Sequence, residues 1–197
     1  MKLEDLDLTK TYTYADYLTW KFEEYVELIK GKVFKMTPAP SRTHQKISTH
    51  ILVKLANYLE GKKCQVFHAP FDVRLSNKRK STSDKEVLSV VQPDICVVCD
   101  PDKLDERGCL GAPDLIVEIL SLSTMKKDID DKFHLYEENG VLEYWIVSPA
   151  DKSVSVYELK NETYELRENI DPIYNKKDIQ VGIFPELILK YDDIFKD

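Results

Sequence analysis

The sequence predicts an α/β protein, because apolar segments of strand length alternate with segments of helical periodicity. Near-continuous apolar runs at 87–98, 115–120 and 144–147 are typical of strands covered on both faces. Apolar residues recur at helical spacing within 41–61, and a second helix is expected at 123–139. We therefore expect a central sheet flanked by helices.

Cap and turn chemistry defines the first elements. Thr13, followed three residues later by Asp16, predicts the start of a short helix. Residues 25–29 and 32–36 flank Lys30-Gly31, which favours a tight hairpin because glycine tolerates a positive φ. An N-terminal hairpin is therefore expected ahead of the long helix.

The long helix is the clearest element of the sequence. Ser41 is a suitable N-cap and Gly61 a suitable C-terminal stop. Strands are expected next at 64–67 and 71–75, and the polar segment 76–86 is typical of an exposed loop. The apolar stripe of the helix consists of Ile47, Ile51, Leu52, Leu55, Ala56 and Leu59.

The second half of the chain repeats the alternation. An acidic loop is expected at 99–112, and Ser123 or Thr124 can cap the second helix, which Gly140 ends. The sequence has no internal repeat and no long linker, so residues 1–197 are expected to form one domain. A further hairpin is predicted for 154–159 and 164–168, with its turn at Lys160-Asn161.

The formal net charge of -7 argues against a protein that holds nucleic acid by bulk electrostatics, since phosphate affinity comes largely from Lys and Arg. Any contact with nucleic acid must therefore be local. Four basic clusters are candidates, although each is also typical of a solvated surface. They are Lys62-Lys63, Lys78-Arg79-Lys80, Lys126-Lys127 and Lys176-Lys177.

Targeting signals and cysteines indicate the cellular compartment of the protein. The segment from Met1 to Asp7 is too acidic for a secretory signal, and no apolar run can span a bilayer, so a cytoplasmic protein is expected. A reducing compartment keeps its four cysteines as thiols. Cys96 and Cys99 have the spacing of a zinc or redox pair, but strand residues three apart point to opposite faces. Buried thiols are therefore favoured over a zinc site.

Two carboxylates interrupt apolar strands. Asp94 lies within 90–98 and Glu118 within 115–120, although an isolated carboxylate in an apolar setting is strongly disfavoured. Neighbouring strands lie about 4.8 Å apart, so these two carboxylates can meet across a strand pair. Asp114 is expected to begin a strand, because four strand residues separate it from Glu118 by about 13 Å.

Lys132 is a third charge in an unusual position. On a helical wheel it falls within the apolar stripe of the second helix, on the side that faces the sheet. Two arrangements remain open: the lysine meets the carboxylates, or it lies at the edge of the stripe and extends to water. The stripe consists of Met125, Ile129, Phe133 and Tyr136.

Two carboxylates with one lysine are the groups that metal-assisted phosphodiester hydrolysis requires. The carboxylates can hold Mg²⁺ through oxygen ligands, and the ion polarises the phosphate and lowers the pKa of a bound water. The lysine can stabilise developing charge or orient that water. A buried ion pair without catalytic function is the alternative.

Several ordered motifs resemble a known family, the Uma-type restriction endonucleases of the PD-(D/E)XK nuclease superfamily. The resemblance implies a restriction-endonuclease-like core with a mixed central sheet flanked by helices and added N-terminal and C-terminal hairpins. It covers nearly the whole chain. The motifs are Tyr25 to Gly31, Pro40 to Gln45, Gln92 to Ile95, Gly111 to Thr124, Asp128 to Lys132 with Tyr136, Gly140 and Glu143 to Trp145, and Phe184 to Leu187.

The resemblance implies that Asp94 and Glu118 are the metal ligands, with Glu27 near the same site. The expected ion is Mg²⁺, with Mn²⁺ as a substitute. The superfamily lysine normally stands two residues after the glutamate, and here that position is Leu120. In this family the role of that lysine has moved to the following helix, to Lys132.

Three further residues are candidates for the lining of the site. Gln92 is expected on the same strand face as Asp94. His44 and Gln45 begin the long helix, and a histidine near carboxylates could serve as an acid/base group. A capping or surface role is nevertheless favoured for His44.

The function expected from these observations is a Mg²⁺-dependent endonuclease that cuts DNA, acting as a homodimer because two strands need two sites. One alternative is a catalytically inactive nuclease-fold protein that binds nucleic acid or protein. Another is a hydrolase of a different phosphoester, since the same metal chemistry would serve. Metal titration separates the first two hypotheses.

Overall fold

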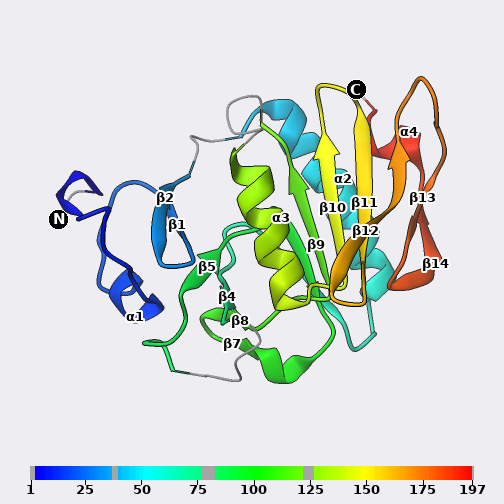
Figure 1. Ribbon diagram of the computed structural model, residues 1–197. Helices are drawn as coiled ribbons and strands as arrows, with labels where there is room; N and C mark the ends of the chain where they lie inside the picture. Colours follow the sequence, from blue (N-terminus) through cyan, green and yellow to red (C-terminus); the bar gives the residue numbers. More distant parts are fainter. Residues whose placement is uncertain (1–2, 37–39, 77–82, 122–126, 197) are drawn as a thin grey trace.

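The computed structural model describes residues 3–36, 40–76, 83–121 and 127–196. In this part of the chain the strands form two six-stranded sheets and one two-stranded sheet, and helices pack against them (Figure 1). The predicted α/β class is therefore confirmed. The expected basic clusters at 78–80 and 126–127 fall wholly or partly outside the described residues.

The central sheet has the strand order β12-β11-β10-β9-β6-β3. β9 and β10 run parallel, whereas the other neighbouring pairs are antiparallel, so the sheet is mixed as expected. Its strands are β3 (Gln65–His68), β6 (Ile95–Val98), β9 (Leu115–Ile119), β10 (Glu143–Ser148), β11 (Ser153–Lys160) and β12 (Thr163–Ile170).

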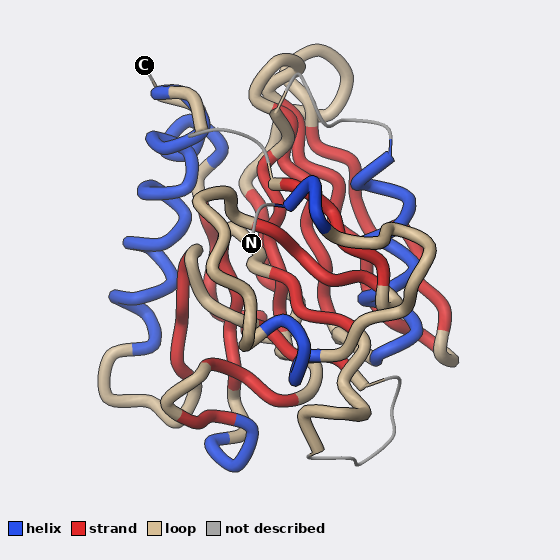
Figure 2. The backbone as a smooth tube through the Cα atoms, turned by 90° about the vertical axis from the view of Figure 1, so that its left-hand side faces the viewer, coloured by secondary structure: helices blue, strands red, loops and turns tan. Residues whose placement is uncertain are grey.

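Two helices cover opposite faces of the central sheet, as the view along its edge shows (Figure 2). α2 (Arg42–Leu59) begins after its cap Ser41, whose side chain accepts a hydrogen bond from the His44 N–H. α3 (Lys127–Asn139) lies on the other face; its expected caps, Ser123 and Thr124, are outside the described residues. No helix in the described chain is both long and apolar enough to cross a membrane.

The apolar residues of the sheet divide by strand alternation between these two helices. Ile95, Val97, Leu115 and Val117 pack with the α2 stripe, whereas Cys96, Val98 and Ile116 pack with α3 residues Phe133, Leu135 and Tyr136. Burial of both faces explains why the strand runs are almost continuously apolar.

The second sheet has the order β2-β1-β5-β4-β8-β7 and lies at the N-terminal side of the molecule. α1 (Tyr14–Tyr17) packs against it and begins with the predicted capping box of Thr13 and Asp16. The strands are β1 (Val26–Ile29), β2 (Lys32–Lys35), β4 (Val73–Leu75), β5 (Ser89–Val91), β7 (Leu104–Asp105) and β8 (Gly108–Leu110). The remaining elements are η1 (Leu3–Asp5), η2 (Pro101–Lys103), β13 (Ile179–Val181), β14 (Phe184–Leu189) and α4 (Tyr191–Ile194).

Both predicted hairpins are present. Lys30 and Gly31 have φ of 49° and 77°, the positive values that a two-residue hairpin turn requires. The second hairpin turns at Asn161 and Glu162, with φ of 49° and 68°, one residue later than expected. Lys160 instead pairs with Thr163, because asparagine tolerates the left-handed conformation better than lysine does.

Two expectations about the middle of the chain were wrong. The run 87–98 is two strands, β5 and β6, which belong to different sheets. Pro93 has no N–H to donate, so the ladder ends there. The expected loop at 99–112 contains β7 and β8, which are too short to show a strand pattern.

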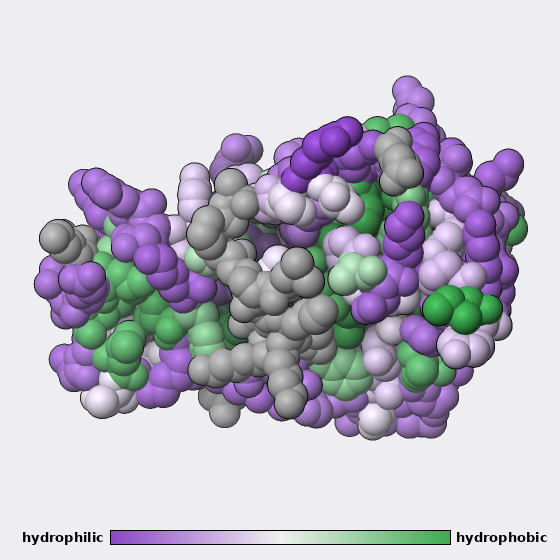
Figure 3. Space-filling model, turned by 90° about the horizontal axis from the view of Figure 1, so that it is seen from above, coloured by the Kyte–Doolittle hydropathy of each residue, from purple (hydrophilic) through white to green (hydrophobic). Residues whose placement is uncertain are grey.

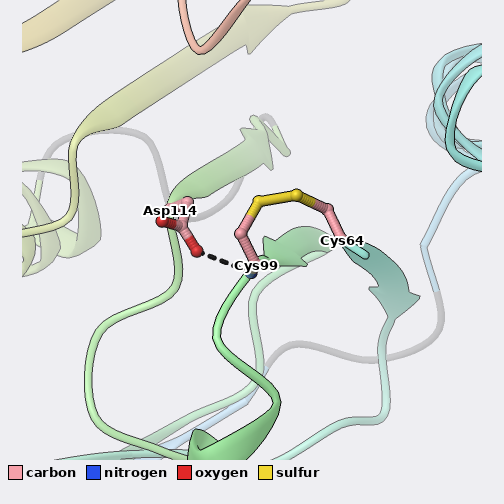
Figure 4. Close-up of a disulfide and its surroundings, with 3 residues drawn as sticks. All are labelled: Cys64, Cys99 and Asp114. Carbon is pink, nitrogen blue, oxygen red and sulfur yellow. Dashed lines mark hydrogen bonds between the residues drawn. A yellow bond between two sulfur atoms is a disulfide. The ribbon is translucent and has the colours of Figure 1, made fainter. Parts of the chain in front are cut away.

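The cysteine expectation also needs correction. Cys64 and Cys99 form a disulfide, whereas Cys96 and Cys109 are buried thiols (Figure 4). β3 and β6 pair with Gln65 opposite Val98, so the two cysteines lie opposite one another just beyond the strands. Asp114 begins the neighbouring strand as predicted, and its carboxylate accepts a hydrogen bond from the Cys99 N–H at 2.7 Å (Figure 4).

Candidate active site

Asp94 and Glu118 lie opposite one another at the ends of two neighbouring strands of the central sheet. β6 and β9 are antiparallel neighbours with Ile95 opposite Val117, and the next position in this register pairs Asp94 with Glu118. Oδ2 of Asp94 accepts a hydrogen bond from the Ile119 N–H at 2.7 Å, which ties the carboxylate to the end of β9. The prediction that the strands of Asp94 and Glu118 are neighbours is confirmed.

The Lys132 side chain points into the protein. Its Nζ lies 2.9 Å from Oε1 of Glu27 and 3.0 Å from Oε1 of Glu118, and the lysine side chain is only 12% exposed. The alternative in which Lys132 extends to water is therefore wrong. Burial lowers the pKa of Lys132, but the charges of Glu118 and Glu27 outweigh burial and raise it, so the ammonium stays protonated.

Glu27 reaches the site from the other sheet. It lies on β1 and is buried, and its Oε1 also accepts a hydrogen bond from the Gln92 N–H at 2.9 Å. The two sheets therefore meet at this cluster, where the chain crosses from β5 to β6. α3, which carries Lys132, contacts both β1 and the central sheet.

The pKa of Glu118 lies well above the ordinary value of a glutamate. Burial is the main cause that raises its pKa, to about 7, and the charges of Asp94 and Glu27 add to it. Lys132 opposes this rise, as does Tyr136, whose hydroxyl donates to Oε1 of Glu118 at 2.7 Å.

Tyr136 is a site residue that was not singled out from the sequence. It stands four residues after Lys132 on α3, so the two side chains share a helix face. The signal was present in the apolar stripe, but a tyrosine there is equally compatible with the core. Only its hydroxyl contact with Glu118 distinguishes the two roles.

His44 is buried and contacts the same site. Its Nε2 lies 3.2 Å from Oδ2 of Asp94, so a surface role for this histidine is wrong. Burial by itself lowers the pKa of His44, but its hydrogen bond to Asp94 and the Asp94 charge contribute to a net rise. The Nδ1 atom is buried and has no hydrogen-bond partner in the described chain.

The side chains of Gln92 and Gln45 do not join Asp94 and Glu118, although the Gln92 backbone N–H bonds to Glu27. The Gln92 side chain donates to Oδ1 of Asp72 at 2.8 Å, because the break at Pro93 removes the common strand face with Asp94. Gln45 is exposed on α2, where its backbone N–H bonds to the Ser41 carbonyl.

The carboxylate pair retains free oxygen atoms. Within the described chain, Oδ1 of Asp94 and Oε2 of Glu118 accept no hydrogen bond, whereas the other oxygen of each is used. No group of three His, Cys, Asp or Glu side chains in these segments is arranged to hold a metal by itself. Two free carboxylate oxygens nevertheless fit Mg²⁺, which commonly binds one or two carboxylates and completes its shell with water and substrate phosphate.

Comparisons with known proteins give one family match and two similar proteins. The family model Uma2, described as "Putative restriction endonuclease", matches residues 14–184. An uncharacterized protein of Synechocystis sp. is 29% identical over 145 residues, covering 72% of this chain and 71% of that protein. The crystal structure of "a putative nuclease belonging to DUF820" from Anabaena variabilis superposes with a TM-score of 0.72 at 22% identity, covering 93% of this chain and 97% of that one. This last similarity shows a common fold.

Proposed function

Because the chain belongs to the Uma2 family, we propose that it is a metal-dependent endonuclease that hydrolyses DNA phosphodiester bonds. The observation that carries the proposal is the convergence of Lys132 with Glu27 and Glu118, directly beside Asp94. Charged groups are costly to bury, so the convergence of four of them at one point supports a functional site here.

Asp94 and Glu118 would hold the metal through the two oxygens that accept no hydrogen bond. The ion, Mg²⁺ or Mn²⁺ in its place, supplies Lewis-acid polarisation of the phosphate and lowers the pKa of a bound water. His44 and the Ile119 N–H bind the other oxygen of Asp94 and so orient its carboxylate.

Lys132 would stabilise the negative charge that develops on the phosphate. Its ammonium is protonated and lies 2.9 Å from Oε1 of Glu27, which holds it beside Glu118. Glu27 therefore acts by positioning the lysine. Tyr136 fixes Oε1 of Glu118 through its hydroxyl and leaves Oε2 free.

The lysine of this site comes from a helix and not from the strand. Two residues after Glu118, where the superfamily has lysine, stands Leu120, which can only pack. Lys132 reaches Glu118 from α3 instead, so the same pair of charges is assembled from different elements. The supply of this lysine by α3, in place of the strand position now occupied by Leu120, supports a site that has kept its function.

A plasmid-nicking assay with Mg²⁺ or Mn²⁺ tests the proposal. Wild type is expected to convert supercoiled DNA to open circles, and Asp94→Ala, Glu118→Ala and Lys132→Ala are expected to lose this activity while remaining folded. Lys21→Ala, which changes an exposed lysine outside the candidate basic clusters, is the control and should cleave like wild type. Equal cleavage by Asp94→Ala and wild type would refute the assigned site.

A second candidate function is binding without catalysis. It is favoured by one observation: Lys132 is already neutralised by two glutamates, which leaves less charge for a phosphate. A binding module need not hold a divalent ion, so titration of Mg²⁺ or Mn²⁺ against wild type and Asp94→Asn separates the two functions.

A further inference from the structure

A second polar feature lies on the same edge of the molecule as the carboxylates. It is a cavity of about 130 Å³, hereafter the basic cavity, whose polar lining is dominated by four cations. Its walls come from the first turns of α2, the turn between β10 and β11, and the segment after α4. The cations are Arg42, Lys46, Lys152 and Lys196.

The basic cavity is unusual in a protein with a net charge of -7. Among the described residues, no carboxylate lines it and none of the four cations lies in an ion pair. Like charges gathered around one hollow repel one another, and an anion placed among them removes that repulsion. The arrangement therefore favours a negatively charged ligand.

The strand register places the basic cavity near the candidate active site. β9 and β10 are parallel, with Ile119 opposite Val147. Pro149, which lines the cavity, therefore follows the end of β10 on the same side of the sheet as the end of β9, where Glu118 lies. The first turns of α2 contribute to both features, because Arg42 lines the cavity and His44 contacts Asp94. Figure 1 shows the ends of β9 and β10 beside the start of α2, and Figure 3 looks down on this end of the molecule, where both hydrophilic and hydrophobic residues reach the surface.

We infer that the basic cavity binds a backbone phosphate of the DNA substrate, next to the phosphodiester held by the carboxylates. The inference rests on the proposed function and names a binding subsite for its substrate. Arg42 can offer two parallel N–H donors to phosphate oxygens, and the three lysines and the Thr43 hydroxyl can add single donors. These groups recognise phosphate and not base edges, so the contact orients the strand without selecting a sequence.

Binding of a fluorescent DNA duplex without divalent ions tests the subsite. The triple variant Arg42→Gln, Lys46→Gln, Lys152→Gln is compared with Lys10→Gln, Lys21→Gln, Lys85→Gln, which removes the same charge from exposed sites elsewhere. The cavity variant is expected to bind at least about tenfold more weakly than this control at low salt. Its slope of log K against log salt should become shallower by about 0.9 for each phosphate that the variant no longer neutralises.

Equal affinity and equal salt slope in the two triple variants would overturn the inference. If the cavity variant does not fold, the double variant Lys152→Gln, Lys196→Gln, which leaves α2 intact, is expected to weaken binding in the same direction. A double variant with wild-type affinity would then overturn the inference.

Inorganic phosphate provides a second arm that distinguishes DNA from a free anion. Competition by millimolar phosphate against the duplex in wild type, but not in the cavity variant, supports the subsite. Phosphate binding that depends on the cavity, with duplex affinity equal in both triple variants, assigns the cavity to a free anion and overturns the inference. If Asp94→Ala loses nicking but binds the duplex as wild type does, the result concerns the carboxylates and not the basic cavity. Failure of the proposed function can therefore be distinguished from failure of this inference.

Discussion

At the scale of single residues, the cluster depends on one cation shared by two glutamates. Lys132 compensates Glu27 and Glu118, all three nearly enclosed, with side chains 12%, 9% and 13% exposed. Buried pairs of this kind contribute little relative to a well-packed apolar alternative, but removal of one partner leaves an uncompensated charge. The stability of the site is therefore sensitive to Lys132 in particular.

Lys132→Met is expected to lower the free energy of unfolding by about 3 kcal/mol at pH 8. The loss should be smaller at pH 5, because Glu118, whose pKa burial raises to about 7, is mostly protonated there and needs no cation. Urea unfolding at the two pH values measures the difference. Lys63→Met, at an exposed position, is the control, and an equal loss at both pH values would contradict the expected cause.

The pKa of Glu118 predicts a pH dependence for metal binding. Burial and the neighbouring carboxylates raise this pKa to about 7, so Glu118 is mostly protonated at pH 6 and mostly ionised at pH 8. A protonated carboxyl is a poor ligand, so Mg²⁺ affinity should rise about tenfold between these values, and binding should release nearly one proton at pH 6 and almost none at pH 8. Titration calorimetry in two buffers of different ionisation enthalpy measures both quantities.

Asp94→Asn is the control for this titration, since it removes a ligand charge without changing the side-chain shape. It is expected to show no Mg²⁺ binding at either pH. Binding to wild type that does not change between pH 6 and pH 8 would mean that Glu118 does not ligate the ion.

At the scale of elements, one buried carboxylate binds the turn of the β13–β14 hairpin to the central sheet, in addition to the apolar core that the two share. Glu143 on β10 accepts hydrogen bonds from Trp145 Nε1 at 2.7 Å, from the Gly182 N–H at 3.0 Å and from the Ile183 N–H at 2.9 Å. Each of these donors is left without its partner if the carboxylate is removed. Glu143 is thus a structural carboxylate, in contrast to Glu118.

Glu143→Ala is expected to lower the free energy of unfolding by about 3 kcal/mol, because three donors are left unsatisfied. Chemical denaturation compares it with Glu165→Ala, an exposed glutamate on β12 that should change stability by less than about 0.5 kcal/mol. Similar small effects for both variants would show that the hairpin does not depend on Glu143.

The disulfide joins β3 to β6 across a sequence separation of 35 residues. Denatured but unreduced protein is expected to contain two reactive thiols, Cys96 and Cys109, and four after reduction. Reduction should lower stability by about 3 kcal/mol, since the cross-link restricts the unfolded chain. The double variant Cys64→Ser, Cys99→Ser should show two thiols in either state, and four thiols in unreduced wild type would refute the bond.

At the scale of the whole molecule, the proposed reaction requires two sites, because cleavage of a duplex breaks two strands. We expect a homodimer with a mass of twice 22.9 kDa, measured by light scattering during size-exclusion chromatography. A monomer at micromolar concentration that still linearises plasmid would contradict this expectation. A monomer that only nicks would instead restrict the proposal to single-strand cleavage.

Much of the fold follows from local signals in the chain. The cap at Ser41, the apolar stripe of α2, and the positive-φ turn at Lys30-Gly31 each depend on residues within a few positions of one another. The expected helices and hairpins therefore appear with small shifts at their ends. The split of 87–98 between two sheets was missed, because a strand pattern does not say which sheet a strand joins.

Three anomalous charges can be recognised from the chain alone, because Asp94, Glu118 and Lys132 stand where burial disfavours them. Which side chains come into contact follows from the folded arrangement of the sheets and helices. The contact of His44 with Asp94, the arrival of Glu27 from the other sheet, and the pairing of Cys64 with Cys99 all depend on strand register and helix packing. These are relations between segments far apart in the chain, and no local pattern specifies them.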